Sequence, residues 1–380
     1  MLVILMERSE NQEPLGVAEE KIRYKWIDQA RGFIMFLLVV TSVFPPGEWK
    51  PEGSVLFWLF GHPNPDALYM TLFDVGAAAF IFVLGMLFTV SFAKRKAKKG
   101  AKEAVFYVVK RYGLLLLLGF LIIAADGEFI YENRGYTVIS WDVIPTLGLV
   151  GFVAIPFAFI KDNKVRLILA YAWMVLYQNL MNFADLKGYA KASVHGGIFG
   201  TIFGFSGIMI VAACLGEYIF LSKDSEFIKY KRMALFGAIN FLVGLTLSFL
   251  PELEANKRQV SLSYCLLSIG TTILGLMVFI LIEKIYNKEV RLFSMYGKSP
   301  FFTYFIAEVP VFILDQTVGD DLGMGPIGNV IVLTVLLIYT TTILWTLYKK
   351  QKIISTEKAA IIFIIVAAIL AGILIGFGII

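Results

Sequence analysis

Two histidines are the side chains of this sequence best suited to carry a proton near neutral pH. They are His62 and His195, and the 380 residues contain no other histidine. Asp74 follows His62 by twelve positions, close enough for its carboxylate to return and orient the imidazole ring. A histidine oriented in this way can take a proton from an alcohol or an amine during acyl transfer. The alternatives are an exposed loop histidine at position 62 and a helix-boundary residue at position 195.

Two short groups of charged residues are candidates for binding an anionic cofactor. Asp28 and Arg31 stand three residues apart, which places them on one face of a helix. Lys110 and Arg111 stand about two turns inside a later apolar stretch. A guanidinium group matches phosphate oxygens in two-point geometry, so these groups predict an anchor for a phosphorylated cofactor. The alternatives are a stabilising ion pair for the first group and side chains that reach toward lipid headgroups for the second.

The elements that must position these residues are long apolar stretches. Hydrophobic residues make up 58% of the chain and charged residues 17%, which excludes an ordinary water-soluble domain. A hydrocarbon layer about 30 Å thick needs about 20 residues of helix to cross it. About eleven stretches approach that length, and they cover residues 29–44, 72–92, 104–125, 143–160, 165–183, 197–221, 233–250, 260–282, 301–314, 327–348 and 359–380. The sequence therefore predicts an all-α, polytopic helical membrane protein with about eleven transmembrane helices.

The positive charges predict the orientation of these helices. Lysines and arginines concentrate in every second connection, as in residues 94–102 and 223–232, and such connections are retained in the cytoplasm. This pattern places the amino terminus in the cytoplasm and the carboxyl terminus outside. We expect residues 1–26 to form a cytoplasmic tail and residues 27–380 a single transmembrane helical domain.

Composition also bears on partners and metals. The net charge of +5 is accounted for by the inner connections, where anionic lipids attract it, so no nucleic-acid partner is expected. Cys214 and Cys265 both fall inside predicted spans, which argues against a cysteine-rich zinc site, and no metal is expected.

Glycines repeat at four-residue spacing in two of the predicted spans. Gly196, Gly200 and Gly204 form a smooth stripe that lets another backbone come close, or alternatively lines a ligand passage. Gly372 and Gly376 have the same spacing on the last span, which suits either helix packing within the chain or self-association as a homodimer.

Several runs resemble a known family. Residues 26–32, Trp-Ile-Asp-Gln-Ala-Arg-Gly, resemble the opening signature of transmembrane acyltransferases related to heparan-alpha-glucosaminide N-acetyltransferase. Residues 296–304 are similar to a later landmark of that family, and so is the order of His62, Asp74, Phe80, Phe82 and Gly85. The resemblance implies an eleven-helix enzyme in which His62 is essential. Such an enzyme takes an acetyl group from cytosolic acetyl-CoA and delivers it to an amino sugar on the far side of the membrane.

The residues and the resemblance together predict a multi-pass acyltransferase of a prokaryotic plasma membrane. It would move an acetyl or other acyl group from cytosolic acyl-CoA to an amine or hydroxyl of an extracytoplasmic sugar or glycan. His62 would act directly as a base or carry the acyl group as a covalent intermediate. The predicted catalytic residues are His62 and Asp74, the cofactor-binding residues are Asp28, Arg31, Lys110 and Arg111, and the acceptor-binding residues are His195 and Asp66.

A proton-coupled transporter or flippase is the alternative function. Glu308 and Asp315, in and near the ninth predicted span, are carboxylates of the kind that such proteins use. No paired interrupted helices occur in two corresponding halves, which makes this alternative weaker.

Overall fold

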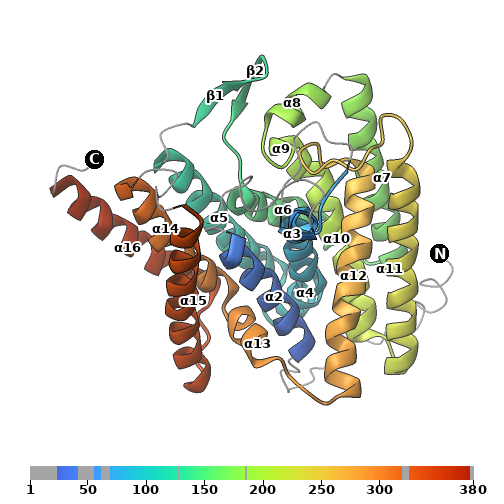
Figure 1. Ribbon diagram of the computed structural model, residues 1–380. Helices are drawn as coiled ribbons and strands as arrows, with labels where there is room; N and C mark the ends of the chain where they lie inside the picture. Colours follow the sequence, from blue (N-terminus) through green and yellow to red (C-terminus); the bar gives the residue numbers. More distant parts are fainter. Residues whose placement is uncertain are drawn as a thin grey trace. The chain divides into compact units, whose positions relative to one another are not determined.

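The computed structural model describes residues 24–41, 55–60, 69–125, 129–184, 186–318 and 325–376, and these form helices with one short hairpin (Figure 1). The helices of the first half are α2 (Lys25–Thr41), α3 (Val55–Phe60), α4 (Gly76–Lys99), α5 (Ala101–Ala125), α6 (Val143–Phe157), α7 (Asn163–Phe183), α8 (Leu186–Ala192) and α9 (Gly197–Phe199). The second half contains α10 (Ser206–Leu221), α11 (Glu226–Ser248), α12 (Leu262–Ile285), α13 (Arg291–Lys298), α14 (Pro300–Val318), α15 (Gly325–Lys349) and α16 (Thr356–Gly376). A 3-10 turn, Phe73–Val75, precedes α4, and a π-helical turn, Gly200–Phe205, joins α9 to α10.

Each of the predicted spans contains a helix, and part of the membrane prediction is confirmed. Among the described residues, five helices are long and apolar enough to cross a bilayer. They are Phe73–Lys99, Ala101–Ala124, Gly197–Leu221, Leu262–Ile285 and Val330–Lys349. The count of eleven spans and the cytoplasmic amino terminus stay predictions.

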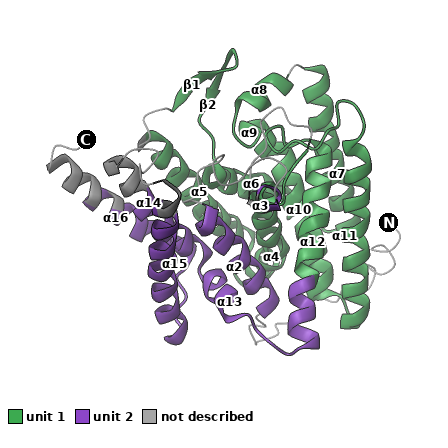
Figure 2. Ribbon diagram, in the orientation of Figure 1, with its two compact units in different colours: residues 1–22, 62–277 green, residues 23–61, 278–380 purple. Residues whose placement is uncertain are grey.

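The chain divides into two compact units (Figure 2). Unit 1 comprises Met1–Ile22 and His62–Met277, and unit 2 comprises Arg23–Gly61 and Val278–Ile380. The predicted tail, residues 1–26, lies almost entirely outside the described residues.

The core of unit 1 depends on close helix packing at glycines. A Cβ atom at Gly216 of α10 would lie 1.9 Å from the carbonyl oxygen of Met86 in α4. At Gly148 of α6 it would lie 2.6 Å from the backbone nitrogen of Leu116 in α5. Distances this short exclude any side chain, so glycine is required where these helices cross.

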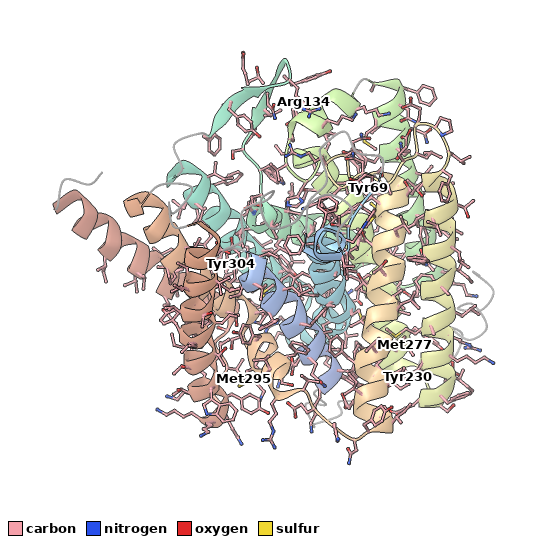
Figure 3. All side chains as sticks on the ribbon, viewed as in Figure 1. Tyr69, Arg134, Tyr230, Met277, Met295 and Tyr304 are labelled. Carbon is pink, nitrogen blue, oxygen red and sulfur yellow. The ribbon has the colours of Figure 1, made fainter. Side chains whose placement is uncertain are left out.

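The helices of unit 1 alternate in direction, which gives the unit two ends. The connections 99–101, 158–162 and 222–225 lie at one end, and residues 129–142, 186–196 and 249–261 lie at the other (Figure 1). Arg134 and Tyr230 mark these opposite ends in Figure 3. The lysine-rich and arginine-rich connections of unit 1 therefore share the end that carries Tyr230.

Unit 2 brings together two of the runs singled out in the sequence. Helix α2 packs against α13, and a Cβ atom at Gly32 would lie 1.6 Å from the carbonyl oxygen of Phe293. At Gly297 it would lie 1.7 Å from the carbonyl oxygen of Asp28. Residues 26–32 and 296–304 thus meet at a helix crossing that needs both glycines.

A β-hairpin is the exception to the all-α prediction. Strands β1 (Ile130–Asn133) and β2 (Tyr136–Ile139) pair antiparallel, with Ile130 opposite Ile139. The two turn residues, Arg134 and Gly135, have φ values of 53° and 77°, the positive angles that a two-residue hairpin turn of type I′ needs. A hydropathy window does not detect so short an element, although its β-branched and aromatic residues favour strands.

Candidate functional site

Four titratable side chains converge at the end of unit 1 that carries the hairpin. The Nζ atom of Lys257 lies 3.6 Å from Oδ1 of Asp74, and Nε2 of His195 lies 3.8 Å from Oδ1 of Asp142. The two pairs are neighbours, because the charges of both Asp74 and Asp142 act on Lys257. We call these four residues the polar cluster.

Asp74 is held rigidly at the start of α4. Its side chain is 1% exposed, and its Oδ2 atom accepts hydrogen bonds from the backbone nitrogen of Thr71 at 2.9 Å and the hydroxyl of Thr71 at 3.2 Å. Its carbonyl oxygen accepts a hydrogen bond from the Tyr264 hydroxyl at 2.9 Å. The buried carboxylate therefore has one orientation, in which its Oδ1 atom faces Lys257.

Lys257 stands in the connection between α11 and α12, which is cross-linked by its own polar groups. The Asn256 side chain accepts a hydrogen bond from the Gln259 nitrogen at 3.0 Å, and the Ser261 hydroxyl donates to the Glu254 carbonyl oxygen at 2.7 Å. Burial lowers the pKa of Lys257, and the nearby charges of the two aspartates oppose that effect. Its ammonium group is therefore held in place and gives up a proton more easily than a solvated lysine does.

The side chain of Asp142 is accessible, and its carboxyl group is nevertheless affected by burial. Asp142 precedes α6 at the N-cap position without making a side-chain capping bond, and 60% of its side-chain surface is accessible. Burial nevertheless raises the pKa of this carboxyl group. The Asp142 carboxyl group is therefore accessible, and it ionises less readily than a fully solvated carboxyl group.

His195 lies behind Asp142 and has an unusual backbone. Its side chain is 7% exposed, and its ring meets the ring of Phe205 edge-on at 6.0 Å. His195 has a φ of 53°, and Gly196 and Gly197 follow with φ values of 68° and 58°. Three consecutive left-handed residues turn the chain sharply before α9 and bring the imidazole toward the start of α6.

The polar cluster therefore has two layers. Asp142 and Lys257, with side chains 60% and 21% exposed, can be reached by another molecule, whereas Asp74 and His195 are buried behind them. A desolvated carboxyl group beside a desolvated ammonium group can exchange protons with a substrate, because the pKa values of both move toward neutrality.

The structure brings two predicted site residues into the polar cluster. They are Asp74, predicted to be catalytic, and His195, predicted to bind the acceptor. Thr71 and Lys257 are among the partners of Asp74. His62 and Asp66 lie outside the described residues, so their predicted roles stay predictions.

The predicted cofactor anchor is divided between the two units. Asp28 and Arg31, in unit 2, form the expected pair at 3.8 Å and are largely buried. Lys110 and Arg111, on α5 of unit 1, are exposed and half-buried respectively. The joint binding of phosphates by these residues stays a prediction.

Sequence reasoning missed Asp142 and Lys257. Lys257 had one usable signal, since it belongs to the connections that are poor in positive charge, where a lysine is unusual. Asp142 had a weaker one, as an aspartate directly before an apolar helix usually caps the backbone. In this structure it makes no such bond.

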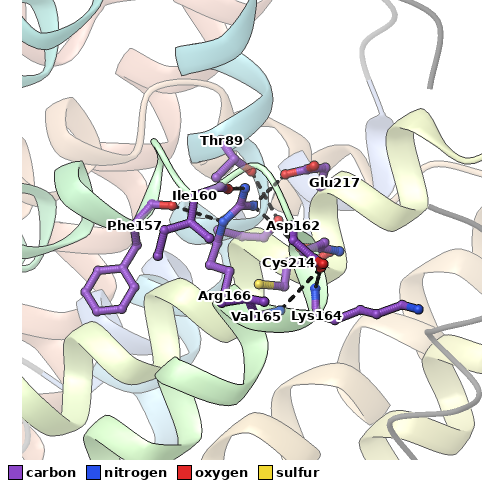
Figure 4. Close-up of polar contacts among 11 residues, drawn as sticks. Thr89, Phe157, Ile160, Asp162, Lys164, Val165, Arg166, Cys214 and Glu217 are labelled. Carbon is purple, nitrogen blue, oxygen red and sulfur yellow. Dashed lines mark hydrogen bonds and ion pairs between the residues drawn. The ribbon is translucent and has the colours of Figure 1, made fainter. Parts of the chain in front are cut away.

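A second polar group, at the opposite end of unit 1, is structural (Figure 4). Arg166 is 3% exposed and donates hydrogen bonds to the carbonyl oxygens of Phe157, at 3.1 Å, and Ile160. It also pairs with Oε2 of Glu217 at 2.6 Å. The guanidinium group thus satisfies carbonyl groups at the end of α6 and ties that end to α10. Among the described residues, no group of three or more His, Cys, Asp or Glu is placed to hold a metal.

Comparison with protein families identifies a matching family model. The model of the GWT1 family matches residues 70–304, more than half of the chain, and this range includes all four residues of the polar cluster. No curated protein matches the chain. The match overturns the resemblance to heparan-alpha-glucosaminide N-acetyltransferase, which is wrong. Residues 26–32, one of the runs on which the resemblance rested, lie outside the matched range and contribute to the helix crossing at Gly32.

Proposed function

Because this chain belongs to the GWT1 family of membrane acyltransferases, we propose that it transfers an acyl group from an acyl-CoA to a hydroxyl of a membrane-bound inositol lipid. The family acts in acylation of inositol during the biosynthesis of glycosylphosphatidylinositol anchors. Neither acetyl-CoA nor an amino-sugar acceptor has support from this match. The family also favours acyl transfer over the transporter or flippase that Glu308 and Asp315 could serve.

The observation that carries the proposal is the accessible pair of Asp142 and Lys257, supported from behind by His195 and Asp74. Asp142 takes the proton of the acceptor hydroxyl as its oxygen attacks the thioester carbonyl. The ammonium group of Lys257 stabilises the negative charge that forms on the carbonyl oxygen. The carbon–sulfur bond then breaks, an ester bond remains, and the departing thiolate receives a proton from Lys257 or Asp142.

The two buried residues, Asp74 and His195, stabilise the charged forms of Lys257 and Asp142. Asp74 favours the charged form of Lys257, because a carboxylate 3.6 Å away stabilises an ammonium group. His195 faces the carboxyl group of Asp142 and, once protonated, stabilises its negative charge. His62 remains a second candidate base, on the predicted argument that it stands in a loop close to Asp74.

The donor is proposed to arrive from the opposite end of unit 1. Lys110 and Arg111 lie in the first half of α5: Arg111 is about 15 Å along the helix from Ala101, at the end with the basic connections, and about 20 Å from Ala125 at the other end. In the predicted orientation the CoA phosphates stay at the cytoplasmic end, and the thioester reaches the polar cluster at the other end.

The proposal is tested with purified protein in proteoliposomes and radiolabelled palmitoyl-CoA. The acceptors compared are a glycosylphosphatidylinositol precursor, phosphatidylinositol and glucosamine. We expect label on an inositol lipid, and loss of about 100-fold or more in the Lys257→Ala and Asp142→Asn variants. Lys187→Ala is the matched control, because Lys187 lies at the same end and pairs with the exposed Glu252. Full activity of both cluster variants, or label on glucosamine alone, would contradict the proposal.

A further inference from the structure

The three glycines of the predicted stripe, Gly196, Gly200 and Gly204, leave a space that one valine side chain occupies. We call this space the glycine seat. A Cβ atom would lie 2.5 Å from Cγ1 of Val260 if built at Gly204, and 2.9 Å and 3.0 Å from its Cγ2 if built at Gly196 and Gly200. Val260 is fully buried, and it belongs to the connection that carries Lys257. The close approach expected of these glycines is therefore made by a loop.

Val260 has a strained backbone, and it is hydrogen-bonded to the backbone of Lys257. Its φ is 55°, a left-handed value that a β-branched residue rarely adopts. Its backbone nitrogen donates a hydrogen bond to the carbonyl oxygen of Lys257 at 3.2 Å, closing a turn. A strained residue persists only where its surroundings determine it, and here the glycine seat holds the side chain in place.

Side chains of α7 secure both ends of the same connection. The amide nitrogen of Gln178 donates to the carbonyl oxygen of Glu252 at 2.8 Å, and its amide oxygen accepts from the Leu262 nitrogen at 2.9 Å. The Tyr177 hydroxyl donates to the carbonyl oxygen of Gln259 at 3.0 Å. The turn from Lys257 to Val260 is thus held on one side by hydrogen bonds from α7 and on the other by the packing of Val260 against the three glycines.

The segment with the seat also contacts the other half of the polar cluster. Gly200 and Gly204 belong to the π-helical turn, and the hydroxyl of Thr201 in that turn accepts a hydrogen bond from the Trp141 indole at 2.9 Å. Trp141 is the residue before Asp142. A π-helical turn inserts an extra residue into a helix and is frequent at functional sites. In this protein it lies between the chain segments that carry the two accessible groups.

We propose that the π-helical turn Gly200–Phe205 is a positioning element of the reaction centre. Gly204 and Val260 are its positioning residues: the empty space at Gly204 admits Val260, and the turn closed by Val260 sets the Lys257 ammonium group against Asp74. This inference rests on the proposed function, since it takes Lys257 to act on the substrate.

The test compares Gly204→Ala with Gly207→Ala in the palmitoyl-CoA assay, using the inositol lipid that accepts label. An alanine at 204 meets Val260, whereas an alanine at 207 meets Cγ of Met174 at 2.4 Å, away from the Lys257 connection. We expect Gly204→Ala to lower kcat by about 10- to 100-fold, because small misplacements of a reacting group are costly. Its KM for palmitoyl-CoA should stay within about twofold of the parent, and Gly207→Ala should keep kcat within about threefold.

A double-mutant cycle with Val260→Ala separates a loss of positioning from a loss of stability. It also keeps the inference testable if Gly204→Ala folds poorly. Val260→Ala removes the two methyl groups that occupy the seat, so adding Gly204→Ala in that background should cost less than about threefold in kcat. Equal kcat losses in Gly204→Ala and Gly207→Ala, or equal costs of Gly204→Ala in both backgrounds, would overturn the inference. Loss of activity in Lys257→Ala with full activity in Gly204→Ala would overturn the inference alone, whereas full activity in both Lys257→Ala and Asp142→Asn would overturn the proposed function.

Discussion

Replacing Asp74 with asparagine is expected to move the alkaline side of the pH–rate profile to lower pH. The negative charge of Asp74 stabilises the ammonium form of Lys257, which raises the pKa of that lysine against the lowering effect of burial. Asparagine has nearly the same shape but no charge. Lys257 would therefore lose its proton, and with it the ability to stabilise the reaction's negative charge, at a lower pH.

The magnitude follows from the separation of the two charges. At 3.6 Å, an effective dielectric constant of about 20 gives an interaction of about 4.6 kcal/mol, or about three pKa units. Lys257 is 21% exposed and also interacts with Asp142, so part of this interaction is screened and part is retained. We expect a shift of about one to three pH units.

The assay measures kcat against pH for the parent, Asp74→Asn and Glu252→Gln. Glu252 is the matched control, because it lies in the same connection as Lys257 but is exposed and pairs with Lys187. The control profile should overlay that of the parent. A folded Asp74→Asn variant with an unmoved alkaline side would refute the assigned pairing. A change confined to the pH range of histidine would instead support the prediction that Asp74 orients His62.

Three further outcomes are expected. Arg166→Met should lower the free energy of unfolding by about 3–5 kcal/mol, because it leaves the largely buried carboxylate of Glu217 without its partner. Denaturant titration in detergent measures this change, and a loss below about 1 kcal/mol would contradict it. Gly32→Ala should destabilise unit 2, because the new methyl group would overlap the carbonyl oxygen of Phe293, and an unchanged melting temperature would exclude that crossing. His62→Ala tests the second candidate base: on the predicted catalytic role of His62 the variant loses acyl transfer while acyl-CoA binding is retained, whereas a fully active variant in proteoliposomes would remove His62 from the mechanism and leave Asp142 as the base.

The glycines show how far a spacing pattern can be interpreted. Four-residue spacing at Gly196, Gly200 and Gly204 predicted a close approach, and the structure confirms one. The pattern alone could not identify the approaching segment, because any backbone satisfies the same spacing. Only the fold shows that the segment is the loop of Val260, whose strain no local propensity would predict.

The sequence by itself determined the positions of the long apolar helices and the membrane class. Apolar length acts segment by segment, since each crossing helix must satisfy its own backbone hydrogen bonds in lipid. The tertiary structure decided which charged residues form the site. Asp74 could be selected by residue type, but its pairing with Lys257 joins α4 to a connection far along the chain. The same holds for Asp142 and His195. Such pairings depend on how helices cross and loops are seated, and those contacts leave no periodic trace in the sequence.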